Sequence, residues 1–213
     1  VTREDFEYRE VPVPEPAEGE FLVRNLYLSF DPTQRGWMME GPGYVPPVAI
    51  GEVMRAGSVG QVVRSRHPAF AEGDLVQATG GWQDFSVTDG TGLLPVRRLP
   101  EGIPPTWALG VLGRTGQTAY WGMLDLGRPQ PGDTVLVSGA AGATGSVAGQ
   151  IARSRGCRVV GIAGGPDKGR WLTEKARFDA AIDYRSEDVN RRIGELCPDG
   201  VNLHFENVGG PIL

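Results

Sequence analysis

The chain has 213 residues, a formal net charge of −5 and two cysteines, Cys157 and Cys197. A negative balance argues against a general nucleic-acid surface, which needs basic residues to displace phosphate counterions. Two cysteines outside any C-x-x-C pair do not predict a disulfide framework. No apolar run approaches the roughly 18 residues of a membrane helix, and the first residues do not resemble a signal peptide, so we expect a cytoplasmic protein.

The first half of the chain predicts a β-rich domain. Short extended segments alternate with Pro and Gly turn signals, which is typical of a compact, largely antiparallel barrel. A short helix is expected over Thr33–Met39, after the turn at Pro32. The expected strands are Phe6–Val13, Glu20–Phe30, Gly51–Ser65, Asp74–Thr79 and Trp82–Val87.

The pattern changes at a Pro- and Gly-rich stretch, residues 99–105, which predicts a boundary between a domain of residues 1–105 and one of residues 106–213. Helices are expected around Trp107–Leu112 and Thr118–Leu126. Beyond Pro131, strands then alternate strictly with helices, and such crossovers predict a parallel α/β sheet. The expected strands are Thr134–Ser138, Arg158–Ala163, Ala180–Tyr184 and Asn202–Glu206, and the helices between them are Ala143–Ser154, Asp167–Ala176 and Ser186–Leu196.

A glycine-rich turn joins the first of these strands to its helix. Gly139, Gly142 and Gly145 are spaced G-x-x-G-x-x-G, a variant of the dinucleotide-binding fingerprint. That chemistry needs glycines because a tight turn must bring backbone N–H groups and the helix N-terminus against a pyrophosphate. The alternative is a merely tight turn in another α/β fold. Because strand, helix and second strand all follow at the expected places, dinucleotide binding is favoured.

The end of the second strand indicates which dinucleotide is bound. An NAD enzyme usually presents an acid to the ribose about 20 residues after the glycines, but here small residues follow Ala163, and then Lys168. Asp167, beside Pro166, is interpreted as a helix N-cap. Lys168 is either an exposed helix lysine or a contact to the 2′-phosphate of NADP(H). We favour the phosphate contact and therefore expect NADP(H).

A zinc site is not expected. Such a site needs three or four convergent Cys, His or carboxylate ligands, whereas the soft ligands of the chain are limited to His67, His204 and the two cysteines. These residues are interpreted as ordinary loop and core residues.

Several segments resemble the zinc-free branch of the medium-chain dehydrogenase/reductase superfamily that contains prostaglandin and 2-alkenal (double-bond) reductases. The similarity extends over essentially the whole chain. The segments that carry it, in order, are Asn25–Pro32 with Arg35 and Gly36, Tyr44–Pro47, Gly51–Met54, Gly81–Asp84, Thr118–Tyr120, Ala140–Gly145 and Glu206–Gly210.

The resemblance implies a GroES-like β-rich domain followed by a Rossmann doubly wound parallel sheet, with the active site in the cleft between them. It also implies NADPH-dependent reduction of the C=C bond of α,β-unsaturated aldehydes or ketones by hydride transfer to the β-carbon. The alternatives are an NADPH-dependent quinone reductase and a non-catalytic NADPH-binding protein. For a full-length protein the resemblance points to a homodimer, and no nucleic-acid or membrane partner is expected.

Carried over residue by residue, the resemblance implies two groups of positions. Cofactor contacts fall on Gly142, Ala143, Thr144 and Gly145 at the pyrophosphate, on Lys168 and Tyr184 at the adenosine phosphate end, and on Asn207 near the far side of the cofactor. Tyr44 matches a tyrosine of the substrate pocket, and simple loop packing beside Pro46 is an equal alternative.

One departure concerns the length of the sheet. A complete fold of this kind has six strands, whereas the pattern here predicts four. We therefore expect a truncated Rossmann domain whose C-terminal part is missing. Because that part would carry further nicotinamide and substrate contacts, the sequence does not name the catalytic residues.

Overall fold

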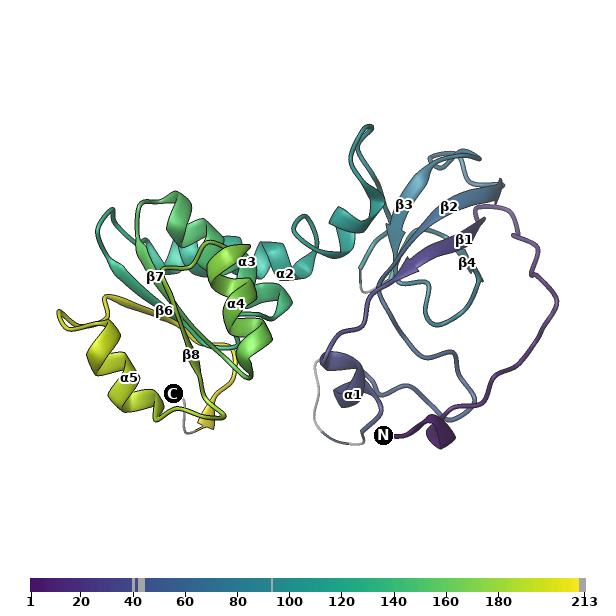
Figure 1. Ribbon diagram of the computed structural model, residues 1–213. Coiled ribbons are helices and arrows are strands. Elements are labelled where there is room, and N and C mark those ends of the chain that lie inside the picture. The colour runs from purple at the N-terminus through teal and green to yellow at the C-terminus, as the bar shows by residue number, and fades with distance from the viewer. Residues whose placement is uncertain (40, 42–44, 93, 211–213) are drawn as a thin grey trace. The chain divides into compact units, whose positions relative to one another are not determined.

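The computed structural model describes residues 1–39, 41, 45–92 and 94–210. The chain forms two compact units, Val1–Leu109 and Gly110–Leu213, and each is described by itself (Figure 1). Within the described ranges, no helix has both the length and the apolar character needed to cross a membrane.

The first unit is built on a five-stranded antiparallel sheet with the strand order β4-β1-β2-β3-β5. No ladder among the described residues joins the two edge strands, so pairing does not close the predicted barrel. Short helices, η1 (Arg3–Asp5), α1 (Thr33–Trp37) and η2 (Pro105–Leu109), accompany the sheet. The strands are β1 (Phe21–Leu28), β2 (Ser58–Ser65), β3 (Leu75–Ala78), β4 (Phe85–Thr88) and β5 (Arg97–Arg98).

An aromatic and β-branched core holds this sheet together. Phe21 is fully buried and stacks on Phe70 with ring centroids 4.4 Å apart. Val23, Val62 and Val76 complete the cluster from three neighbouring strands. Apolar burial of this kind is the main term that stabilises such a unit.

Two of the strands predicted in this unit are absent or shorter in the structure. Residues 6–13 form no strand, because prolines at 12 and 14 offer no N–H groups to a ladder. The segment expected from Gly51 becomes a strand only at Ser58. The two-residue strand β5 was missed, and α1 ends at Trp37, two residues before the expected Met39.

The second unit contains a four-stranded parallel sheet with the order β8-β7-β6-β9. Its strands are β6 (Thr134–Val137), β7 (Arg158–Ala163), β8 (Ala180–Asp183) and β9 (Leu203–Phe205). Its main helices are α2 (Arg114–Tyr120), α3 (Ala143–Ser154), α4 (Pro166–Glu174) and α5 (Val189–Leu196).

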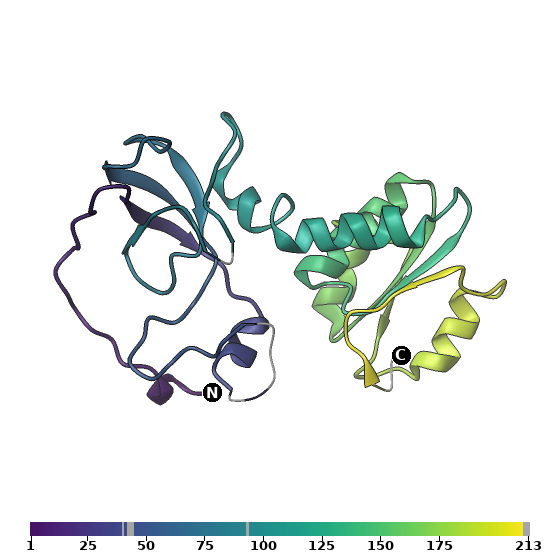
Figure 2. The ribbon, with the colours of Figure 1, turned by 180° about the vertical axis from the view of Figure 1, so that it is seen from behind.

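Helices cover both faces of this sheet (Figures 1 and 2). Val135 and Val137 point to the face packed by α2, α3 and α4, whereas Leu136 between them points to the face packed by α5. A central strand that is apolar on both faces is what a doubly wound parallel sheet requires. This confirms the predicted fold class for the second half of the chain.

The order of the strands creates a topological switch. The chain runs outward from β6 to β7 and β8, then returns to place β9 on the other side of β6. In open α/β sheets ligands bind outside the carboxyl ends of the strands at such a point. The glycine-rich turn follows β6 and therefore lies at this switch.

Helix boundaries differ from the predictions in three places. η2 occupies residues 105–109 in place of the helix expected over 107–112. Instead of one helix over 118–126, α2 continues into a π-helix, η3 (Trp121–Gly127). This π-helix ends at Arg128, which has the left-handed conformation with φ 49°. The helix expected from Ser186 begins only at Val189, because Asp188 caps it.

Candidate dinucleotide site

The turn between β6 and α3 depends on its glycines. Gly139 has φ +53°, which favours a residue without a β-carbon. A β-carbon on Gly145 would lie 2.5 Å from the carbonyl oxygen of Gly139, and one on Gly142 would lie 3.1 Å from the same atom. The start of α3 therefore packs directly on its own loop, and side chains at these positions would force the helix and the loop apart.

The N-terminus of α3 presents donors without a side-chain cap. Gly142 is the N-cap residue, and its own N–H donates to the Gly139 carbonyl at 2.9 Å. The N–H groups of Ala143, Thr144 and Gly145 have no partner inside the helix, as at every helix start. Together with the helix dipole, they suit an anionic group such as a pyrophosphate.

Asn207 is fastened beside this loop. Its backbone N–H donates to Ser138 Oγ and its side-chain Nδ2 donates to the Ser138 carbonyl, both at 2.8 Å. A β-carbon on Gly139 would lie 3.4 Å from Cβ of Asn207. The structure thus brings Asn207, at the end of β9, to the glycine turn after β6.

Glu206 supports the same corner, a role that the sequence did not indicate. Its carboxylate lies 3.0 Å from His204 Nε2 and accepts the N–H groups of Val208 and Gly209, the latter at 2.6 Å. Burial raises the pKa of Glu206, but these backbone donors and Ser138 outweigh it, so the pKa lies below its ordinary value. The carboxylate therefore stays charged and holds the turn after β9.

At the end of β7 two glycines precede α4. Gly164 is buried, and Gly165 has φ +92° and donates its N–H to Asp183 Oδ1 at 2.8 Å. The predicted N-cap role of Asp167 was wrong: Gly165 is the N-cap residue, and Asp167 lies inside the first turn, paired with Arg170. Lys168 follows in that turn with an exposed side chain.

Side chains from the end of β8 cover Gly164. A β-carbon on Gly164 would lie 2.8 Å from the Tyr184 hydroxyl oxygen and 2.8 Å from Arg185 Nε. These two residues therefore occupy the space next to Gly164. Tyr184 was predicted as a cofactor contact, whereas Arg185 was missed, although a cation directly after that tyrosine was a visible signal.

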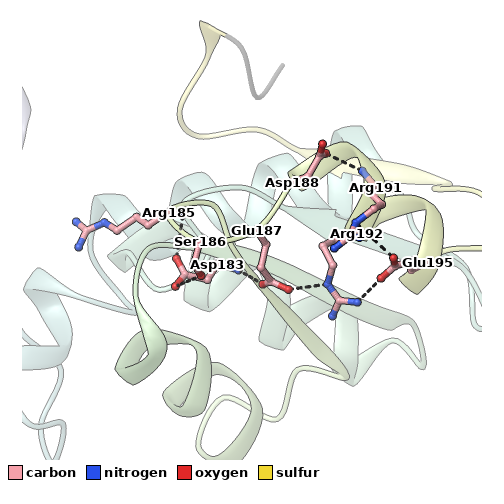
Figure 3. Close-up of polar contacts among 8 residues, drawn as sticks. All are labelled: Asp183, Arg185, Ser186, Glu187, Asp188, Arg191, Arg192 and Glu195. Carbon is pink, nitrogen blue, oxygen red and sulfur yellow. Dashed lines mark hydrogen bonds and ion pairs between the residues drawn. The ribbon is translucent and has the colours of Figure 1, made fainter.

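Asp183 links the loops that follow β7 and β8, and Figure 3 shows its contacts within the second of them. Its Oδ1 accepts both the Gly165 N–H and the Arg185 N–H, the latter at 3.0 Å, and its Oδ2 accepts the Ser186 hydroxyl. The Gly165 N–H, followed by that of Arg185, lowers the pKa of Asp183 below its ordinary value. The ionised carboxylate thus fixes both loops at one edge of the sheet.

One predicted site residue and one hollow belong to the first unit. Tyr44 lies outside the described residues. In the first unit a shallow hollow is lined by polar side chains that include Glu52, Arg55 and Gln83. Arg55 donates to the carbonyl of Pro46 at 3.1 Å, so its guanidinium is fixed at the rim.

No metal cluster is found in the described ranges, where no three His, Cys, Asp or Glu side chains gather closely enough to hold an ion. Cys157 and Cys197 are buried free thiols, and burial raises the pKa of each. The expected independence from zinc stays a prediction to be tested in solution.

Comparison with known proteins agrees with this architecture. Residues 1–96 match a family model described as the N-terminal domain of oxidoreductase, and residues 143–213 match one described as zinc-binding dehydrogenase. The chain belongs to the medium-chain dehydrogenase/reductase family, and its relatives include proteins named curcumin reductase, prostaglandin reductase 1 and 2-alkenal reductase.

Individual relatives resemble the chain over nearly its whole length. It is 44% identical over 209 residues to the NADPH-dependent curcumin reductase of Escherichia coli (98% of the chain, 60% of the relative). It is 39% identical over 203 residues to the 2-alkenal reductase (NADP(+)-dependent) of Nicotiana tabacum (94% and 59%). The crystal structure of CurA from Vibrio vulnificus in complex with NADPH superposes with a TM-score of 0.92 at 43% identity (100% and 62%). The chain thus spans about three fifths of the length of these proteins.

Proposed function

We propose that the protein is an NADPH-dependent reductase of the C=C bond in α,β-unsaturated aldehydes and ketones. The observation that carries the proposal is the glycine turn at the topological switch of the sheet. It is combined with basic side chains, and with small residues in place of a ribose-binding acid, where β7 ends. The relatives bearing the names curcumin reductase and 2-alkenal reductase support the substrate class.

The proposal assigns the NADPH contacts to residues of the second unit. The first-turn N–H groups of α3, from Ala143 to Gly145, would bind the pyrophosphate. Lys168 and Tyr184, from the ends of β7 and β8, would bind the 2′-phosphate end. Asn207, held rigidly by Ser138, would orient the part of the cofactor that lies across the switch point.

When bound, NADPH supplies a hydride for the β-carbon of the conjugated carbonyl compound, and the resulting enolate is then protonated. The chain contributes positioning to this reaction. The Ser138–Asn207 and Glu206 contacts fix the turn after β9 against the glycine loop, so the polar groups at the switch are preorganised. We further propose that residues 1–105 form the substrate-side domain, in which Tyr44 lines the pocket.

The test is NADPH oxidation, followed at 340 nm, with three reaction mixtures: a 2-alkenal, a quinone and no acceptor. The proposal expects oxidation with the 2-alkenal and formation of the saturated aldehyde. NADPH oxidation in the quinone mixture and not in the 2-alkenal mixture would instead indicate a quinone reductase. Tight NADPH binding without turnover in any mixture would instead indicate a non-catalytic binding protein.

A further inference from the structure

We propose that Arg185 is a second cation for the 2′-phosphate of NADPH, acting beside Lys168 and held in place by the Asp183 bridge. This inference rests on the proposed function and adds a specificity-determining residue to it. Neither the sequence pattern nor the glycine fingerprint singled out this arginine.

The first observation is the convergence of two side chains above the end of β7. The hydroxyl oxygen of Tyr184 and Nε of Arg185 both lie 2.8 Å from the position that a β-carbon of Gly164 would take. The Arg185 guanidinium carbon lies 5.9 Å from the centroid of the Tyr184 ring. A phenol hydroxyl and a guanidinium thus converge at the end of β7, the region where the sequence predicts the 2′-phosphate to bind.

The second observation is that two nearby acids, Glu187 and Glu195, are paired with another arginine. Glu187 pairs with Arg192 at 2.7 Å, and Glu195 pairs with Arg192 at 2.5 Å. Figure 3 shows the Arg185 side chain extending away from this cluster. Across the described ranges, no carboxylate lies within ion-pair distance of its guanidinium, and Asp183 attracts it electrostatically from farther away.

The third observation is that the arginine has a rigid base. Asp183 Oδ1 accepts the Arg185 N–H at 3.0 Å and the Gly165 N–H at 2.8 Å, and the Asp183 N–H donates to Glu187 at 2.7 Å. The backbone of Arg185 is therefore tied to the start of α4, where Lys168 lies. Lys168 and Arg185 thus follow two neighbouring parallel strands, β7 and β8, beyond their carboxyl ends.

These observations fit a phosphate better than a ribose hydroxyl. A phosphate with about two negative charges can pair with two cations. A guanidinium also offers a planar fork that binds two phosphate oxygens at once. Because a free 2′-hydroxyl carries no charge, Arg185 should contribute much less to ligands that lack the phosphate. The predicted effect is therefore on cofactor choice.

The experiment uses adenosine fragments, which report this end of the site without turnover. Titration calorimetry measures the binding of adenosine 2′,5′-bisphosphate and of 5′-AMP to the wild type, Arg185→Gln and Arg185→Lys. The matched control is Arg155→Gln, which removes an exposed arginine of the turn that precedes β7, at the opposite edge of the sheet. Arg185 is itself exposed, so Arg185→Gln should fold, and melting curves check this.

Arg185→Gln should weaken the bisphosphate about tenfold or more while changing 5′-AMP by less than about threefold, as expected for loss of a charge-assisted contact. Arg185→Lys should fall between, and the control should match the wild type. Unchanged bisphosphate binding in Arg185→Gln, or equal weakening of both fragments, would overturn the assignment. A wild type that does not prefer the bisphosphate would instead overturn the NADPH choice in the proposed function.

Discussion

Phe178 packs between two glycines, and this contact sets how closely α3 lies on the sheet. A β-carbon on Gly149, in α3, would lie 1.9 Å from Cζ of the ring, about half of a normal carbon–carbon contact of roughly 3.5–4.0 Å. On the other side, a β-carbon on Gly161, in β7, would lie 2.9 Å from the ring. The ring is only 3% exposed, so it has little room to retreat. We predict that Gly149→Ala destabilises the second unit.

The size of the effect follows from two opposing terms. Alanine in a helix interior gains about 0.8–1 kcal/mol over glycine. Overpacking a buried contact costs about 1–3 kcal/mol and occasionally more. Because the collision is severe and confined on both sides, we expect a net loss of about 2 kcal/mol. For a unit of this size that corresponds to a lower Tm by about 8–16 °C.

Gly194→Ala is the matched control. Gly194 lies in α5, is exposed, and has no atom within 4 Å of the place of its β-carbon. It should raise the free energy of unfolding by about 0.5–1 kcal/mol, since only the helix term applies.

Thermal and urea unfolding, followed by circular dichroism, measure both variants. A second substitution, Phe178→Leu, should cost less in the Gly149→Ala background than in the wild type, because the smaller side chain relieves the collision. If Gly149→Ala proves as stable as Gly194→Ala, the close packing of α3 described here is wrong.

Four further predictions concern cofactor choice, zinc and the stability of the second unit. Lys168→Ala should weaken NADPH by about 10- to 150-fold and hardly change NADH, as fluorescence titration will show; unchanged discrimination would contradict the phosphate contact. Chelators should leave activity unchanged, and stoichiometric zinc whose removal abolishes activity would refute this. Asp188→Ala should cost about 0.5–2 kcal/mol in urea unfolding, because Asp188 Oδ1 accepts the Arg191 N–H at 3.0 Å at the start of α5; an unchanged midpoint would contradict the cap. Asp183→Asn should be less stable than the wild type near neutral pH. The pKa of Asp183 in the folded protein lies below its ordinary value of 3.8, so the difference in stability should be fully present above pH 3.8. It should shrink as the pH falls through the folded-state pKa of Asp183. A difference in stability that does not depend on pH would contradict this prediction.

Patterns local in the sequence predicted the dinucleotide unit well. The alternation of apolar strands with helices placed β6, α3 and β7 almost to the residue, because each pattern reports burial along a short segment. The close approach of the loop to α3 at Gly142 and Gly145 was predicted from the spacing of the glycines, which is also local in the sequence.

Contacts between distant residues could not be predicted in this way. The Asp183 bridge joins two loops 18 residues apart, and its carboxylate resembles any other acid at the end of a strand. Arg185 was not predicted because its position beside Gly164, which has no β-carbon in the way, appears only in the folded structure. In the first unit, the apolar residues of 6–13 suggested a strand, but ladder pairing depends on partners and free N–H groups that the local pattern does not contain.

In the proposed reaction, hydride from NADPH reaches the β-carbon of a conjugated carbonyl compound. Supplying NADPH deuterated at C4 of the nicotinamide together with a 2-alkenal, and locating the deuterium by NMR, tests this step. We expect a saturated aldehyde labelled at its β-carbon. An allylic alcohol labelled at the former carbonyl carbon would contradict it.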